Sequence, residues 1–139
     1  MGQRESVVLP RLPSSARAAR TVLLGVLEAA GRHGGPHAGV AELLVSELAT
    51  NAVRYGTGDD FGLEVEVRGA AVRVAVHDRN PLVPRARRVG ASEEGGRGLA
   101  LVQVLATAWG AEPTPAGKVV WFVIDTAGRV DAGAPGAAW

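Results

Sequence analysis

The sequence predicts an α+β domain in which a mostly antiparallel sheet packs one of its faces against helices. Two observations support this prediction. The hydrophobic period changes along the chain, from helix-like repeats in residues 16–28 and 37–55 to strand-like alternation in residues 63–68 and 72–76. Only residues 69–71 separate the two alternating segments. That length is typical of a hairpin and therefore predicts antiparallel pairing with one face on the helices.

The composition describes one globular domain. The chain has 139 residues, of which 47% are hydrophobic and 21% charged, and its formal net charge is +1. This balance creates no global field toward nucleic acid or anionic lipid. The absence of cysteine excludes disulfides and thiolate metal sites. Residues 1–10 lack the layout of a signal peptide and no apolar run could cross a membrane, so we expect a cytoplasmic protein.

The first half of the chain contains a strand and two helices. Residues 5–9 are short and β-branched, which predicts an edge strand that ends at Pro10. A helix over residues 16–28 follows, and the two serines before it can cap its N-terminus. A second helix is expected over residues 37–55, closed by Gly56.

The second half contains the hairpin, a long loop, a helix and a last strand. Residues 79–96 are rich in Pro, Arg, Gly and Glu and have no regular period. A loop of this length in a compact domain is usually functional and often forms a lid. A helix is expected to begin near Gly98 and to end at Trp109-Gly110, and residues 118–124 predict a buried strand after a turn. The tail, residues 126–139, is expected to be disordered.

Glu47 and Asn51 lie four residues apart in a mostly apolar helical segment and therefore share one face of the helix. Buried polar groups are costly unless another group satisfies them. A hydrated Mg²⁺ ion is one such group, because it takes oxygen ligands and usually arrives with phosphates. Asn51 could then offer its carbonyl oxygen to the metal, and Glu47 could accept a proton from a nucleophile. The alternative is a structural helix with an internally paired or solvated couple.

Two further candidates lie downstream. Asp78 directly follows a predicted strand, and its carboxylate can accept a hydrogen bond from an exocyclic amine such as that of adenine. Gly96 and Gly98 open the last helix, where the backbone can approach phosphates closely and Arg97 can add charge. The simpler alternatives are a turn-forming aspartate and a flexible joint between loop and helix.

Taken in order, these motifs resemble the GHKL ATPase superfamily, and within it the small stand-alone branch that contains anti-sigma factor serine/threonine kinases. The resemblance covers roughly residues 14–124. The similar segments are residues 47–56 for the N box, 78–84 for the G1 box, 95–102 for the G2 box, 109–110 for the end of the closing helix and 117–121 for the last strand.

The resemblance implies a two-layer α/β sandwich of the Bergerat type over residues 1–125, with a mixed, mostly antiparallel sheet and helices on one face. It implies ATP and Mg²⁺ as cofactors, Glu47 as the catalytic base and Asn51 as the metal ligand. The residues implied to contact the cofactor are Asn51, Arg54, Asp78, Asn80, Gly96, Arg97, Gly98 and Leu99.

Two residues depart from the pattern of this branch. Tyr55 stands where the branch usually has histidine, and Val119 stands where a threonine often lines the nucleotide. The first change could weaken binding or turnover without abolishing either. Trp109 and Trp121 are expected to pack in the core or at a helix end, because large aromatic side chains fill cores more often than they bind ligands.

The resemblance implies an anti-sigma factor that phosphorylates a serine or threonine of an anti-sigma-factor antagonist, with a sigma factor competing for the regulator. A second hypothesis keeps ATP as a ligand that stabilises a partner-binding surface, without turnover. A homodimer through the apolar face of the first helix also stays open. The hypothesis of a nucleic-acid site at residues 85–88 has less support, because no aromatic residue lies between the arginines. We expect neither a nucleic acid nor a membrane as partner.

Overall fold

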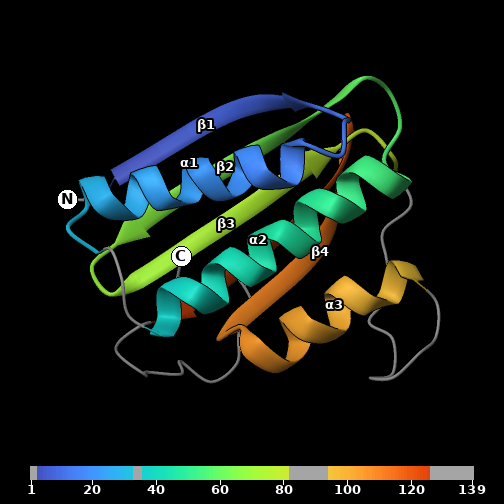
Figure 1. Ribbon diagram of the computed structural model, residues 1–139. Helices are drawn as coiled ribbons and strands as arrows, with labels where there is room; N and C mark the ends of the chain where they lie inside the picture. The colour runs from blue at the N-terminus through green and yellow to red at the C-terminus, as the bar shows by residue number, and fades with distance from the viewer. Residues whose placement is uncertain (1–2, 33–35, 82–93, 126–139) are drawn as a thin grey trace.

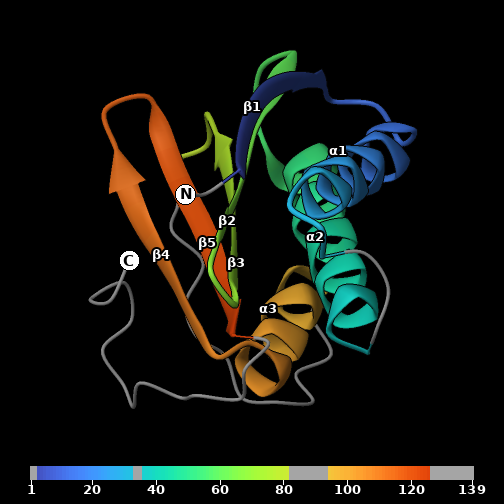
Figure 2. The ribbon, with the colours of Figure 1, turned by 90° about the vertical axis from the view of Figure 1, so that its left-hand side faces the viewer.

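Helices cover one face of a sheet in the computed structural model, which describes residues 3–32, 36–81 and 94–125 (Figures 1 and 2). The elements are β1 (Gln3–Pro10), α1 (Ser15–Ala29), α2 (Pro36–Tyr55), β2 (Asp60–Arg68), β3 (Ala71–Asp78), α3 (Glu94–Leu105), β4 (Ala108–Thr114) and β5 (Gly117–Asp125). The sheet has the order β1-β2-β3-β5-β4, and each neighbouring pair is antiparallel. The predicted α+β sandwich with helices on one face is confirmed.

The hairpin between β2 and β3 is also confirmed. Arg68 pairs with Ala71, so a two-residue turn joins the strands, and Gly69 takes a positive φ of 52° that this turn requires. Side chains then alternate between the two faces of the sheet. Leu63 and Val65 are buried under the helices, while Glu64 lies on the opposite face.

The hydrophobic core lies between the sheet and the helical layer, in which α2 occupies the middle position between α1 and α3 (Figure 1). Its strand side consists of apolar side chains at alternate positions. Its helix side consists of residues that recur every three or four positions, as expected for amphipathic helices. The buried helical members are Ala19, Leu23, Val26, Leu27, Ala41, Leu44, Val45, Leu48, Ala49, Ala52, Leu99 and Val102.

The C-terminal part differs from the sequence-based expectation. The helix α3 begins at Glu94, before Gly98, and ends at Leu105. The prediction that Trp109-Gly110 end this helix is wrong, because both residues lie in β4. This strand was not predicted, because three of its seven residues, glycine, glutamate and proline, are poor strand formers. The strand β4 forms because it pairs with the apolar β5, so a tertiary contact and not the local sequence determines it.

The two tryptophans are structural, as expected, although they lie in strands. Trp109 packs against the main core. Trp121 is only 4% exposed, yet alternation with Val120 and Phe122 places it on the sheet face opposite the helices. Its indole nitrogen donates to Glu112 at 3.2 Å, and Gly110 leaves room for the ring.

Several expectations fall outside the described residues. They concern the central part of the predicted lid, the arginine-rich residues 85–88 and the tail 126–139. Among the helices that the structure describes, none combines the length and the apolar character needed to span a membrane.

Candidate functional site

Glu47 and Asn51 lie half-buried on α2. Ser46 of this helix faces α1, because its hydroxyl accepts a hydrogen bond from the Arg20 guanidinium at 3.0 Å. Each helical residue advances about 100°, so Glu47 and Asn51 are rotated away from this contact. The buried Leu48 and Ala52 lie between them and Ser46 around the helix axis, so both residues are on the flank of α2 opposite to the one that contacts α1. The helix α3 lies on that other side of α2 (Figure 1).

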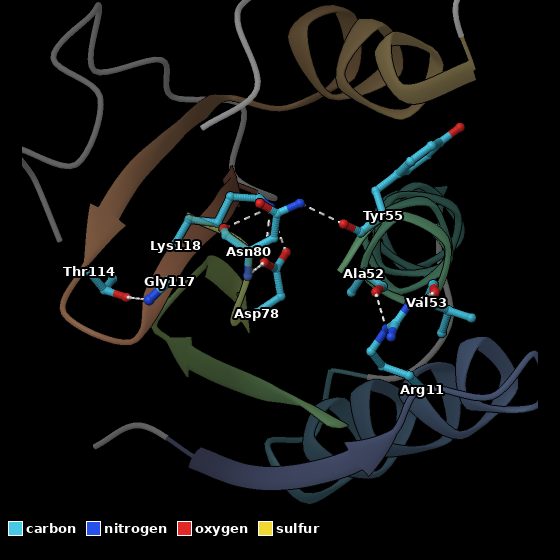
Figure 3. Close-up of polar contacts among 9 residues, drawn as sticks. All are labelled: Arg11, Ala52, Val53, Tyr55, Asp78, Asn80, Thr114, Gly117 and Lys118. Atoms are coloured by element: carbon cyan, nitrogen blue, oxygen red, sulfur yellow. Dashed lines mark hydrogen bonds and ion pairs between the residues drawn. The ribbon is translucent and has the colours of Figure 1, made fainter. Parts of the chain in front are cut away.

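The C-terminal end of α2 is held by Arg11, which follows β1. Its guanidinium donates to the carbonyls of Val53 at 2.7 Å, Ala52 at 3.3 Å and Gly58 at 2.8 Å. Figure 3 shows the first two contacts beneath the end of the helix. The last carbonyls of a helix lack partners within it, and Arg11 supplies donors at this end of α2. The Ala52 carbonyl also accepts a hydrogen bond from the Gly56 N–H at 3.0 Å. The hydrogen bonds of Arg11 also fix the helix end relative to the first strand.

A buried carboxylate ends β3. Asp78 is 7% exposed, and Lys118, also 7% exposed, lies opposite it on β5. The Lys118 Nζ is 2.9 Å from Oδ1 and 2.9 Å from Oδ2 of Asp78. The backbone N–H of Asn80 donates to Oδ1 at 2.8 Å. A buried charge persists only when it is paired in this way, and we call this arrangement the Asp78–Lys118 pair.

Asn80 connects the Asp78–Lys118 pair to α2 (Figure 3). Its side-chain amide donates to the Tyr55 carbonyl at 2.7 Å, and its backbone carbonyl accepts a hydrogen bond from Lys118 Nζ at 3.3 Å. Tyr55 follows Asn51 by one helical turn, which corresponds to about 6 Å along the axis. The structure therefore brings the predicted Asp78, Asn80 and Asn51 to the same end of α2.

Gly117 positions Lys118 by allowing β5 to start directly against the end of β3. A Cβ atom at this position would lie 2.1 Å from the Asp78 carbonyl oxygen and 2.6 Å from the Arg79 carbonyl carbon. Any larger residue would push the strands apart. The Gly117 N–H donates to the Thr114 hydroxyl at 3.1 Å, which closes the turn between β4 and β5 (Figure 3).

Lys118 is a candidate that the sequence analysis missed. The expectation for the last strand concerned Val119, but Val119 pairs with His77 and alternation places it on the sheet face away from Asp78. The residue that faces the carboxylate is Lys118. Two signals were available: it is the only lysine of the chain, and it shares the inward alternation of Val120 and Phe122.

The remaining predicted residues lie on α2 and α3. Arg54 is exposed, and its guanidinium carbon lies 5.6 Å from the centre of the Tyr55 ring. The backbone of residues 96–98 forms the beginning of α3, and the side chain of Arg97 is outside the described part. Leu99 is 2% exposed and packs in the core, so a ligand contact from Leu99 would have to come from its backbone.

Comparison with known proteins accounts for this arrangement. The family model described as histidine kinase-like ATPase domain matches residues 9–124, a span that includes α1 through most of β5. No curated protein matches the chain. Domains of this family typically bind ATP together with Mg²⁺. The chain therefore belongs to the family of histidine kinase-like ATPase domains, and this membership implies ATP binding.

Proposed function

We propose that the protein is an ATP-dependent regulator, an anti-sigma factor that phosphorylates a serine or threonine hydroxyl of an anti-sigma-factor antagonist. The observation that supports this proposal most directly is the bridge formed by Asn80. It joins the buried Asp78 carboxylate to the end of the helix that carries Glu47 and Asn51. The proposed amine acceptor, Asp78, is thus connected to the helix that carries the proposed metal ligand, Asn51, and the proposed catalytic base, Glu47.

The Asp78 carboxylate fits a base amine. An ionised carboxylate offers about four lone pairs. Three contacts engage it, two from Lys118 and one from the Asn80 N–H, and Oδ2 takes part in only one of them. Oδ2 therefore has the capacity to accept a hydrogen bond from the exocyclic amine of adenine.

Asn51 and Glu47 are the proposed metal and base groups. The carbonyl oxygen of Asn51 would bind Mg²⁺, and Glu47 would orient or deprotonate the attacking hydroxyl. When bound, Mg-ATP supplies the phosphoryl group and neutralises its charge, so the protein contributes mainly positioning. The hydrogen bonds of Arg11 to the carbonyls of α2 hold the helix that carries both side chains. A sigma factor is the proposed competitor of the antagonist, and nucleic acid and membrane are not proposed as partners.

Phosphoryl transfer is tested with the Glu47→Gln variant. Titration calorimetry with ATP and Mg²⁺ should give similar affinities for this variant and the wild type. Transfer of labelled phosphate to a candidate antagonist should fall at least about 100-fold, the usual contribution of a general base. Glu42→Gln is the matched control, since Glu42 lies half-buried on the same helix but about 140° away around the axis. Equal transfer by wild type and Glu47→Gln would contradict the kinase mechanism.

The second hypothesis, binding without turnover, gives a different result in the same experiment. The wild type would bind its partner with an affinity that depends on ATP, and labelled phosphate would not appear on the partner. Glu47→Gln would then match the wild type in both measurements. Measuring partner affinity with ATP, with ADP and without nucleotide separates the two hypotheses.

A further inference from the structure

We propose that Lys118 recognises the base together with Asp78, by donating a hydrogen bond to ring nitrogen N1 of adenine beside the amine that Asp78 accepts. This inference rests on the proposed adenine-nucleotide function and adds to it a residue that determines base specificity. It starts from the position of the only lysine of the chain, which is buried rather than on the surface.

The position of Lys118 is fixed by the fold. It lies directly opposite Asp78 in the register between β3 and β5, and Gly117 allows the two strands to meet closely there. The ammonium nitrogen lies at equal distances of 2.9 Å from the two carboxylate oxygens. It therefore contacts both of the oxygens to which an incoming amine could donate. A buried ion pair contributes little net stability compared with apolar residues, so packing alone does not require a lysine here.

The cluster can bind adenine if Lys118 exchanges one of its hydrogen-bond partners. An ammonium has three donors, and Lys118 directs them at two carboxylate oxygens and the Asn80 carbonyl. If Lys118 releases Oδ2, the adenine amine can donate to that oxygen. The released donor of Lys118 can then turn to N1, the acceptor adjacent to the amine. Every donor and acceptor in the cluster remains paired, as buried polar groups require.

Guanine does not fit by the same exchange. Its corresponding edge carries two adjacent donors, N1–H and the 2-amino group, and one acceptor, O6. The two donors would pair with one carboxylate oxygen each, and Oδ1 already accepts from the Asn80 N–H and from Lys118. Lys118 would therefore have to release both oxygens. Only one of the two released donors would find a partner, at O6. The pair thus favours adenine because adenine requires the smaller rearrangement.

The inference is tested with two analogues of ATP and one variant. In 1-deaza-ATP a C–H group replaces N1 and the amine is kept, whereas 7-deaza-ATP keeps the whole recognised edge. The wild type should bind 1-deaza-ATP at least about tenfold more weakly than 7-deaza-ATP, because a hydrogen bond to a charged group is lost. Lys118→Met should bind the two analogues about equally. Arg79→Met, which removes an exposed basic side chain paired with Asp60, should discriminate like the wild type.

A second measurement does not depend on a variant that folds. Because the chain has one lysine, ¹⁵N-lysine labelling gives a single side-chain ammonium resonance in NMR spectra. This resonance should shift with ATP and 7-deaza-ATP, and differently or much less with 1-deaza-ATP.

The outcomes separate this inference from the proposed function. Equal wild-type affinities for the two analogues, or tighter ATP binding by Lys118→Met, would overturn the role of Lys118 and leave ATP binding intact. A wild type that binds no ATP in Mg²⁺ would overturn the proposed function, and this inference with it.

Discussion

The side-chain amide of Asn80 donates to the backbone carbonyl of Tyr55 at 2.7 Å, and this hydrogen bond joins the end of β3 to the last turn of α2. The resemblance implied that Asn80 contacts the nucleotide. In the structure its amide connects two protein segments, and its backbone N–H donates to Asp78. Asn80 is therefore placed to keep the helix of Asn51 in register with the Asp78 carboxylate. The contact with the nucleotide stays a prediction.

Asn80→Ala should loosen this connection. The Tyr55 carbonyl would lose the amide donor, which costs about 1 kcal/mol for a typical intramolecular hydrogen bond. We expect a lower urea midpoint and faster hydrogen exchange in the last turn of α2. Asn80→Asp keeps the size of the side chain, but its carboxylate would face the Tyr55 carbonyl without a donor between them. We therefore expect a larger loss of stability than for Asn80→Ala. Unchanged exchange in the last turn of α2 would contradict the role of this contact.

Arg11 should be important for stability although it lies far in the sequence from the carbonyls that it contacts. Arg11→Met removes charged donors from the carbonyls of Ala52, Val53 and Gly58, and we expect a loss of about 2 kcal/mol. Arg11→Lys should give an intermediate loss, since an ammonium lacks the planar geometry of the guanidinium. Chemical denaturation measures both variants. A midpoint of Arg11→Lys equal to that of the wild type would show that charge alone suffices.

Gly110→Ala should disturb the packing of Trp121. The added Cβ would lie 2.6 Å from the indole ring, so the ring or β4 must move, at a cost of about 1–3 kcal/mol. Near-ultraviolet circular dichroism and denaturation report the change. Gly62→Ala is the matched control, because its Cβ would lie at an ordinary 3.5 Å from the His77 Cβ. Similar losses in the two variants would rule out the indole ring as the cause.

Glu64 should make stability depend on pH in the acid range. Its partial burial raises its pKa, but hydrogen bonds and charge interactions with His77 and Arg4 outweigh this effect and hold the pKa below the ordinary value of 4.5. The ionised carboxylate therefore stabilises the folded protein above pH 4.5, and this contribution is lost as the pH falls through the lowered pKa.

Glu64→Gln tests this dependence. The variant should be less stable than the wild type at neutral pH, and the difference in free energy of unfolding should shrink toward strongly acidic pH. Glu28→Gln, at an exposed position on α1, provides the comparison. A difference between wild type and Glu64→Gln that stays constant over the whole range would contradict the linkage.

Local patterns predicted most of the fold. The helical repeat of α2 and the alternation in β2 and β3 each reflect burial on one face, which the sequence records directly. The strand β4 was missed because it depends on pairing with β5, and a single sequence does not show such pairing. For the same reason the sequence could not place Arg11 at the end of α2.

The sequence predicted which types of residue form the candidate site better than it predicted the contacts between them. The spacing of Glu47 and Asn51 specified a shared helix face, and the position of Asp78 at the end of a strand was correct. Lys118 was overlooked because its partner lies 40 residues away, and only the register of β3 and β5 reveals which residue faces Asp78. The roles assigned to these residues stay predictions.

The order of the strands also determines when the proposed base-recognition site can first form. The segment up to the end of β3 contains Glu47, Asn51 and Asp78, but the partner of Asp78 is on the final strand. Long-range pairing of this kind forms late, because loop closure must precede the contact. A nascent or truncated chain that lacks β5 therefore has Asp78 without its lysine partner, and the proposed recognition pair cannot form until synthesis has passed Lys118.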